Sequence, residues 1–526
     1  SFAEYVSTHV TARYTRWSDA WTSFNTVEKT WAYRQDQLSS THPIAADIPD
    51  VQAVEVNFDG ITYAKGASVL KQLAAYVGIE QFLRAMQVYF RRYEYGNTTL
   101  ADLLGVLSEE SGRDLSRWSQ LWLETAGVNA LHPEFTLDES GRYASFAIVQ
   151  SPAEPGGGPL RDHRLAVGLY RSDGTKLVRT ERVELDVSGA RTEVPELVGV
   201  AQPELLLVND EDLTYAKVRL DERSLATVIA RLGDIDDPLP RTLCWGAAWD
   251  MTRDAEMSAT DFVQLVLRNI GQETDAWGIS RIPAYAASAV HNFSAPEHRE
   301  ALELEWERGL RRLIDEAAPG SDSQLTFVRS YASAAHTTAA LGDLVGLLDG
   351  SLVIDGLAVD QDLRWVLVTG LARAGRYGEA EIAAESERDN TITGHENAAA
   401  ARAAQPLAEA KATAWDAAVL SSNTPNETQR SIVLAFAQHG QDEVLAPYLD
   451  KYLEAAEDMW ERLGTHKASV ALEYIFPKPL ASQALLDRVD SWLESSSANP
   501  AAKRYVREGR ADVARFLAGQ ARDAQQ

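Results

Sequence analysis

The chain has 526 residues, 45% of them hydrophobic and 24% charged, a balance typical of a soluble globular protein with about three domains. Its formal net charge of −27 disfavours nucleic acids and acidic membranes as partners, because both carry negative phosphates. No stretch has the length and apolarity of a membrane-spanning helix, and the N-terminus lacks the pattern of a secretory signal.

Residues 1–130 are predicted to be mainly helical. In SFAEYVSTHVTARY, Phe2, Val6 and Val10 recur every four residues, which predicts one buried helix stripe. A less periodic segment, THPIAADIPD, follows with two prolines. The next predicted helix begins within NFDGITYAKGASVLKQL, a stretch that places a tyrosine two residues before a Lys-Gly pair.

Apolar spacing predicts further helices in this region. Leu70, Leu73 and Val77 recur at intervals of three or four residues, and IEQFLRAMQVYFRRY and TLADLLGVLSEESG continue as short helices that end near glycines. DLSRWSQLWLETAG places Trp118 and Trp122 one helical turn apart, so we expect both side chains in the core.

Near Leu131 the hydrophobic period changes from that of helices to that of strands. FTLDESGRYASFAIVQ and HRLAVGLYRSDGTKLVRTERVELDV predict strands joined by turns at DESG and SDG. The segment SPAEPGGGP between them is expected to be a loop. Residues 131–222 are therefore predicted to form a small antiparallel β-sandwich.

Residues 223–526 are rich in Ala, Leu and Arg and contain amphipathic segments such as LRWVLVTGLARAG and ETQRSIVLAFAQHG. Consecutive helices without intervening strands predict an α-solenoid. Cys244 is the single cysteine, which excludes an internal disulfide framework and favours a reducing, cytoplasmic location. Its apolar neighbours Leu243 and Trp245 predict a buried thiol rather than a nucleophile.

The chain contains no complete catalytic or metal-binding motif. The only His-Glu pair is His395-Glu396, and the second histidine of an H-E-x-x-H motif would fall at Ala399. Histidines such as His9, His42 and His132 are scattered, so we expect each to be at the surface or hydrogen-bonded. G-x-S-x-G, P-loop and dinucleotide-binding patterns are also absent from the sequence.

Several motifs, in the same order, resemble the aminopeptidase N family of zinc metallopeptidases, the actinobacterial-type gluzincins. They are SFAEYVSTH, FDGITYAKGASVLKQL, WSQLWLETAGVNALHPEF, LLLVNDEDLTYAKVRLDERSL, CWGAAWDMTRDAEMSATDFV and KATAWDAAVLSSNTPNETQRSIV. The resemblance implies a mainly α fold with a small β-sandwich. Residues 1–130 would be the helical remainder of a thermolysin-like catalytic domain, residues 131–222 the sandwich and residues 223–526 the α-solenoid.

The family binds one zinc ion through H-E-x-x-H and a later glutamate, which normally stands directly before the stretch that begins here as Ser1-Phe2-Ala3. The resemblance therefore implies zinc in the intact enzyme, ligands upstream of this chain, and no zinc bound by the chain itself. Glu4 is not expected to replace a ligand, because a solvated or capping carboxylate in the first helical turn is the simpler interpretation.

The resemblance also implies a role for Tyr63, the tyrosine of Y-x-K-G, whose hydroxyl would donate a hydrogen bond to the scissile carbonyl oxygen. On the residues alone, packing in the core would be the favoured interpretation of this tyrosine. Phe58 stands where the family places an aromatic wall of the substrate pocket, although a core phenylalanine is the simpler account. Lys65 is interpreted as a surface charge, and Gly66 as a position of close helix approach.

The leading hypothesis is a C-terminal part of a zinc aminopeptidase that acts on short peptides and is inactive without its upstream segment. A rival hypothesis is a non-catalytic helical scaffold that binds peptides or proteins on its concave face. A third is complementation, in which a separate N-terminal piece of the same protein docks on this chain and restores activity.

Overall fold

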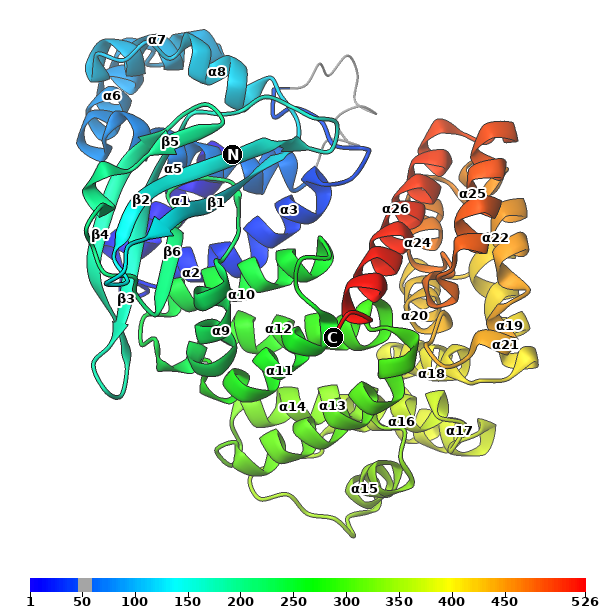
Figure 1. Cartoon of the computed structure of the whole chain (residues 1–526). Coiled ribbons are helices and arrows are strands. Elements are labelled where there is room, and N and C mark those ends of the chain that lie inside the picture. Colours follow the sequence, from blue (N-terminus) through cyan, green and yellow to red (C-terminus); the bar gives the residue numbers. More distant parts are fainter. Residues whose placement is uncertain (46–58) are drawn as a thin grey trace. The chain divides into compact units, whose positions relative to one another are not determined.

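The structure, a computed structural model, describes residues 1–45 and 59–526 (Figure 1). The chain forms two compact units. The first contains Ser1–Asp250 and Gln272–Gly278, and the second contains Met251–Gly271 and Ile279–Gln526. All the β-strands belong to the first unit and most of the helices to the second, so the fold is mainly α with a small β part, as predicted. The division into three domains stays a prediction.

The helical part of the first unit precedes the sheets and continues after them. Its helices are α1 (Phe2–Tyr14), α2 (Ala20–Phe24), π-helix η1 (Asn25–Lys29), α3 (Thr30–Asp36), π-helix η2 (Ile61–Lys65), α5 (Gly66–Val77), α6 (Ile79–Arg92), α7 (Leu100–Ser111) and α8 (Ser116–Leu123), then α9 (Glu222–Arg231), the 3-10 helix η4 (Leu232–Asp234) and α10 (Pro238–Arg253).

The predicted stripe of α1 is confirmed at Phe2 and Val6, which are partly buried against the core, but not at Val10. Val10 is 44% exposed, whereas Tyr5 is buried and packs against Phe82 and Trp21. The four-residue spacing did not identify Tyr5, which contributes to the core together with Phe2 and Val6. The predicted core positions Trp118 and Trp122 are confirmed.

The strands of the first unit form two small sheets. They are β1 (Val128–Leu137), β2 (Tyr143–Glu154), β3 (His163–Ser172), β4 (Leu177–Val187), β5 (Arg191–Glu193), β6 (Leu205–Asp210) and β7 (Lys217–Val218), with the 3-10 helix η3 (Pro195–Leu197) between β5 and β6. One sheet has the order β5-β2-β1-β7 and the other β4-β3-β6.

Two details of the sheets correct the sequence analysis. The pairing is antiparallel except between β1 and β7, which run parallel. Residues 151–154 are not a loop, because they extend β2 and pair with the start of β1, Ser151 opposite Ala130. The expected turns after β1 and after β3 are confirmed.

The second unit is entirely helical. Its elements are α11 (Ala259–Asn269), α12 (Ala276–Ser288), π-helix η6 (Ala289–Phe293), α13 (Pro296–Glu316), α14 (Asp322–Ala334), α15 (Thr338–Asp349), α16 (Gln361–Arg373), α17 (Glu379–Arg388), α18 (Ile392–Ala404), α19 (Ala408–Trp415), π-helix η7 (Asp416–Leu420), α20 (Asn426–Phe436), α21 (Asp442–Leu445), α22 (Tyr448–Ala456), α23 (Met459–Leu463), α24 (Thr465–Tyr474), η8 (Lys478–Leu480), α25 (Gln483–Ser495) and α26 (Pro500–Asp523); the short η5 (Ile270–Gln272) follows α11.

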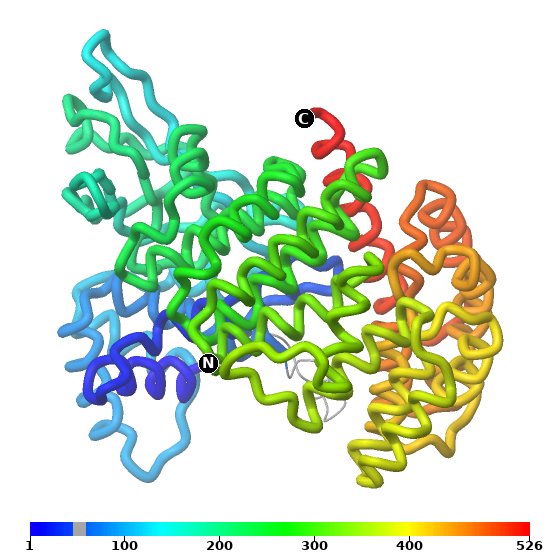
Figure 2. Tube along the Cα trace, turned by 90° about the horizontal axis from the view of Figure 1, so that it is seen from below, coloured from blue at the N-terminus to red at the C-terminus, as the bar shows by residue number. Residues whose placement is uncertain are grey.

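These helices stack as a solenoid, as predicted. The series α14, α16, α18, α20, α24 and α26 forms one layer in which each helix contacts the next. Helices α15, α17, α19 and α25 pair with their successors in the chain, and Figure 2 shows the yellow and orange helices side by side. Such an array buries apolar side chains mainly between neighbouring helices.

The C-terminal helix α26 packs against α11 and η6, two of the first helices of the same unit. The Asp523 carboxylate, which is fully buried, accepts hydrogen bonds from the backbone N–H groups of Thr260 and Ala295, each at 2.9 Å. The rings of Phe516 and Phe293 also meet edge to face. These contacts tie α26 to α11 and to η6, so the solenoid of this unit is closed by its own C-terminal helix.

We predict opposite effects of two Gly-to-Ala substitutions in this unit. A Cβ atom at Gly370, in α16, would lie 2.5 Å from the Ala332 carbonyl oxygen, whereas at Gly342, in α15, it would meet no atom within 4 Å. Gly370→Ala is therefore expected to lower the free energy of unfolding by about 1–3 kcal/mol. Gly342→Ala should raise it by about 0.5–1 kcal/mol. Urea unfolding measures both, and equal effects would contradict this close packing of α16.

Cys244 is completely buried, as predicted, and burial raises the pKa of its thiol, which disfavours the reactive thiolate. Among the described residues, no helix is long and apolar enough to cross a membrane.

Candidate functional site

Tyr63 lies in the π-helical turn η2, which runs without a break into α5. Asp59 begins this turn: its Oδ1 atom accepts hydrogen bonds from the N–H groups of Ile61 and Thr62, both at 3.0 Å. The N–H group of Tyr63 donates to the Asp59 carbonyl oxygen at 3.1 Å. The aspartate therefore satisfies N–H groups that the start of a helix leaves without partners.

The Tyr63 side chain is only half-buried, although its neighbours Ile61, Ala64 and Lys65 are buried. π-Helical turns are rare and occur frequently at functional sites. The second predicted site residue, Phe58, lies outside the described residues. The structure thus places Tyr63 on a well-defined turn, and its catalytic role stays a prediction.

Two neighbouring segments hold the backbone of this turn. The Gly60 N–H group donates to Gln35 Oε1 at 2.6 Å, and the Ser1 hydroxyl donates to the Thr62 carbonyl oxygen at 2.5 Å. A Cβ atom at Gly66 would lie 2.0 Å from Ser1 Oγ. The interpretation of Gly66 as a point of close approach is therefore confirmed.

The interpretation of Lys65 as a surface charge is wrong. Its side chain is completely buried, and Nζ lies 2.8 Å from Asp36 Oδ2 and 3.2 Å from the Gly127 carbonyl oxygen. Burial lowers the pKa of Lys65 to about 8, and the nearby Asp36 opposes this shift. Sequence reasoning missed this site because Asp36 and Gly127 are far from Lys65 in the chain.

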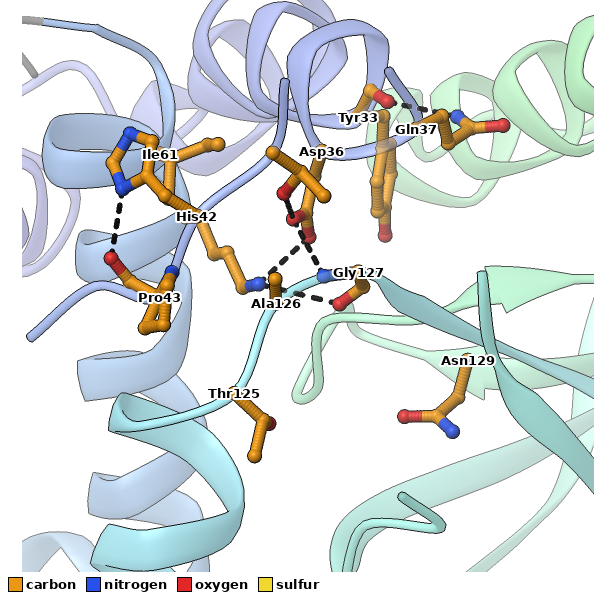
Figure 3. A network of polar contacts seen from close by, with 12 residues as sticks. Tyr33, Asp36, Gln37, His42, Pro43, Ile61, Thr125, Ala126, Gly127 and Asn129 are labelled. Atoms are coloured by element: carbon orange, nitrogen blue, oxygen red, sulfur yellow. Dashed lines mark hydrogen bonds and ion pairs between the residues drawn. The ribbon is translucent and has the colours of Figure 1, made fainter. Parts of the chain in front are cut away.

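Asp36 links the same lysine to the start of β1. The Asp36 Oδ1 atom accepts hydrogen bonds from the Gly127 N–H group at 2.9 Å and from the Thr41 hydroxyl at 2.6 Å. Figure 3 shows Asp36 directed at Gly127, with the chain from Thr125 to Asn129 passing beneath it. Both polar groups of Gly127, its N–H and its carbonyl, are therefore bound by one buried ion pair.

His42 lies beside the same turn. Its Nε2 atom is 2.8 Å from Asp59 Oδ2, and its Nδ1 atom is 2.8 Å from the Pro43 carbonyl oxygen. The hydrogen bond to Asp59 raises the pKa of His42 above its ordinary value. The expectation of a hydrogen-bonded histidine is confirmed here. His9 differs, because it stacks on Tyr5 and its Nε2 atom is buried without a hydrogen bond.

We predict that His42 stabilises the fold in a pH-dependent manner. Because its pKa is raised in the folded state, its contribution is complete below the unfolded pKa and is lost as the pH rises through the folded pKa. His42→Gln should therefore lower the free energy of unfolding by about 1 kcal/mol at pH 5.5 and by less at pH 8.5. Urea unfolding at both pH values measures this difference.

His132→Gln is the matched control, because His132 is half-buried like His42 but lies on β1 rather than beside η2. A cost of His42→Gln that does not change with pH would show that the His42–Asp59 pair is not charged at pH 5.5.

The described residues, 1–45 and 59–526, contain no group of three or more His, Cys, Asp or Glu side chains that could hold a metal ion. Glu4 lies in the first turn of α1, as expected, but it is half-buried rather than solvated. Burial and the nearby Glu28 raise its pKa, which is unfavourable for a metal ligand. These residues therefore do not fit a zinc ion by themselves.

Comparison with known proteins adds two family matches. Residues 205–515 match the ERAP1-like C-terminal domain, and residues 1–122 match the peptidase family M1 domain. Residues 123–204, between the two matches, contain β1 to β5 of the first unit.

The chain is also similar to several individual proteins. It is 50% identical to Aminopeptidase N of Streptomyces lividans over 532 residues, which cover 100% of this chain and 62% of that protein. It is 26% identical to the Tricorn protease-interacting factor F2 of Thermoplasma volcanium, over 52% of this chain and 32% of the relative. It is 37% identical to Aminopeptidase M1-B of Oryza sativa, over 36% of this chain and 22% of the relative. The chain thus spans less than two thirds of the length of these relatives.

Proposed function

Because this chain belongs to the aminopeptidase N family, with a peptidase family M1 part and an ERAP1-like C-terminal domain, we propose that it is the C-terminal part of a zinc-dependent aminopeptidase. The substrates are short peptides, from which the whole enzyme removes N-terminal residues. We place the zinc ligands outside this chain; this is supported by the described residues, which do not fit a metal ion, and by the chain's covering only 62% of its Streptomyces relative. The chain by itself is therefore expected to hydrolyse no peptide.

The observation that carries this proposal is the placement of Tyr63. Its turn is fixed by Asp59, Gln35 and Ser1, while its own side chain remains half-buried and thus keeps contact with solvent. When water attacks a peptide carbonyl group, negative charge grows on the carbonyl oxygen. A tyrosine hydroxyl held in a fixed position can donate a hydrogen bond to that oxygen and stabilise it.

A fixed donor is more effective than a mobile one. Its orientation does not have to change as charge develops, so no reorganisation energy is spent in the transition state. The π-helical turn, capped at one end and continued by α5 at the other, holds the backbone of Tyr63, which supports this proposed role. We also propose a cytoplasmic location, which is supported by the single, buried Cys244.

The proposal is tested by hydrolysis of L-alanyl and L-leucyl p-nitroanilides. The chain 1–526 and the longer protein that includes the zinc-binding residues are compared, and zinc is measured in both after dialysis. We expect activity and stoichiometric zinc only in the longer protein. Hydrolysis, or stoichiometric zinc, in the chain 1–526 would contradict the assignment of the ligands to residues outside it.

The same assay addresses the two rival hypotheses. A longer protein that holds zinc and binds peptides without hydrolysing them would favour the peptide-binding scaffold. Complementation is tested by adding a separately produced N-terminal piece to the chain 1–526. Recovery of p-nitroanilide hydrolysis would establish that the upstream segment can act from a separate chain.

A further inference from the structure

The buried ion pair between Lys65 and Asp36 is placed where it controls the turn of Tyr63. Lys65 is the last residue of η2, and Asp36 is the last residue of α3. Both side chains are completely buried, with 2.8 Å between Lys65 Nζ and Asp36 Oδ2. The pair therefore joins the end of one helix to the end of another.

Gly127 connects this ion pair to the backbone before β1. Its N–H group binds Asp36 and its carbonyl oxygen binds Lys65. Its φ angle of +79° is in the region that favours glycine, and a Cβ atom there would lie 2.8 Å from the Glu154 carbonyl oxygen. Because Gly127 directly precedes β1 and lies against the end of β2, the ion pair anchors η2 to the sheet.

The anchored residue Lys65 lies two residues after Tyr63 in the same turn. Residues two apart in a helical turn point to different sides. With Lys65 directed inward to Asp36, the Tyr63 side chain is turned to another side of the same turn, where it is half-buried. A rotation of η2 that released Lys65 would move the Tyr63 hydroxyl at the same time.

Stability alone does not explain a buried ion pair at this position. Removing two charges from water is costly, and apolar residues of similar volume are often as stabilising or more so. Burial also lowers the pKa of Lys65 to about 8, against the opposing effect of Asp36. Directional hydrogen bonds to both sides of Gly127 provide what apolar packing does not, namely a defined orientation of the turn.

We propose that Lys65, through Asp36 and Gly127, is a positioning residue that holds the Tyr63 hydroxyl in its catalytic orientation. This inference rests on the proposed function, because it needs a reaction in which Tyr63 takes part. Lys65 itself is buried and does not touch the substrate. Its effect on catalysis should therefore pass entirely through Tyr63.

A double-mutant cycle in the longer, zinc-containing protein tests this proposal. Lys65→Met is expected to lower kcat on the order of 10²-fold with little change in KM, because a small misplacement of a catalytic group is costly. In a Tyr63→Phe background, Lys65→Met should change kcat about twofold or less, since the group that it positions is already gone. An undiminished effect in that background, or an unchanged kcat in the single variant, would overturn the proposal.

A second variant and a control keep the result unambiguous. The double variant Lys65→Met, Asp36→Asn removes both charges but keeps an acceptor for the Gly127 N–H group. It therefore tests the positioning role of the ion pair if Lys65→Met alone does not fold. Lys29→Met is the matched control, because Lys29 also ends a π-helix and is buried against an aspartate, Asp212. It should lower stability without lowering kcat; a loss of kcat equal to that of Lys65→Met would overturn the proposal.

The cycle also separates this inference from the proposed function. If Tyr63→Phe leaves kcat unchanged, the role of Tyr63 fails and Lys65 has nothing to position. If Tyr63→Phe lowers kcat and Lys65→Met does not, the proposed function stands and only the positioning role is lost.

Discussion

Replacing Tyr63 by phenylalanine in the longer, zinc-containing protein should lower kcat on the order of 10²–10³-fold, because removal of one oxyanion donor typically has this effect. KM should change little, since the hydrogen bond strengthens only as negative charge develops on the carbonyl oxygen. The fold should be retained, because the Tyr63 ring stays and the turn is held by backbone contacts of other residues. Steady-state hydrolysis of leucyl p-nitroanilide measures both constants.

Tyr76→Phe, on α5, is the matched control for the loss of a hydroxyl. Its ring packs against the guanidinium group of Arg113 through its face, and this contact does not need the hydroxyl. We expect kcat of Tyr76→Phe to equal that of the unchanged protein. A Tyr63→Phe variant with the same kcat as this control would remove Tyr63 from the mechanism and leave the family assignment intact.

The second large effect is expected at Arg161, whose side chain is completely buried in the first unit. Its guanidinium group donates to the carbonyl oxygens of Leu121, Thr125 and Ala126 and to Asn129 Oδ1, at 2.8–3.2 Å. Arg161→Met would leave these acceptors buried without donors. We expect the free energy of unfolding to fall by about 3–5 kcal/mol, and the melting temperature by about 10 °C.

Arg117→Met is the control for loss of an arginine from the same region. The Arg117 side chain is 71% exposed and pairs with Asp162 across 3.1 Å, so its removal should cost about 0–1 kcal/mol. Thermal unfolding followed by circular dichroism compares the two variants. A similar melting temperature for both would contradict the inference that Arg161 holds the end of α8 against the start of β1.

Local patterns in the sequence were sufficient for much of the fold. Apolar spacing predicted α5 with Leu73 and Val77 in the core, the Trp118–Trp122 pair, and the switch from helices to strands near Leu131. Such features depend on neighbours within a few residues, so their periodicity is visible in one chain. Tyr63 was singled out as a candidate by its family motif, and the structure places it on a distinct turn.

Only the tertiary structure decided which polar residues are buried and what they bind. The sequence suggested a surface position for Lys65, and no pattern around Asp36 or Arg161 predicts that they are buried. The partners of these residues lie far from them in the chain. Asp36 forms an ion pair with Lys65 and a hydrogen bond with Gly127, and Arg161 donates a hydrogen bond to Asn129. A buried charge is tolerated only where its partners are supplied in three dimensions. The Lys65–Asp36 ion pair that anchors the Tyr63 turn therefore could not be predicted from the sequence, because its residues meet only in the folded chain.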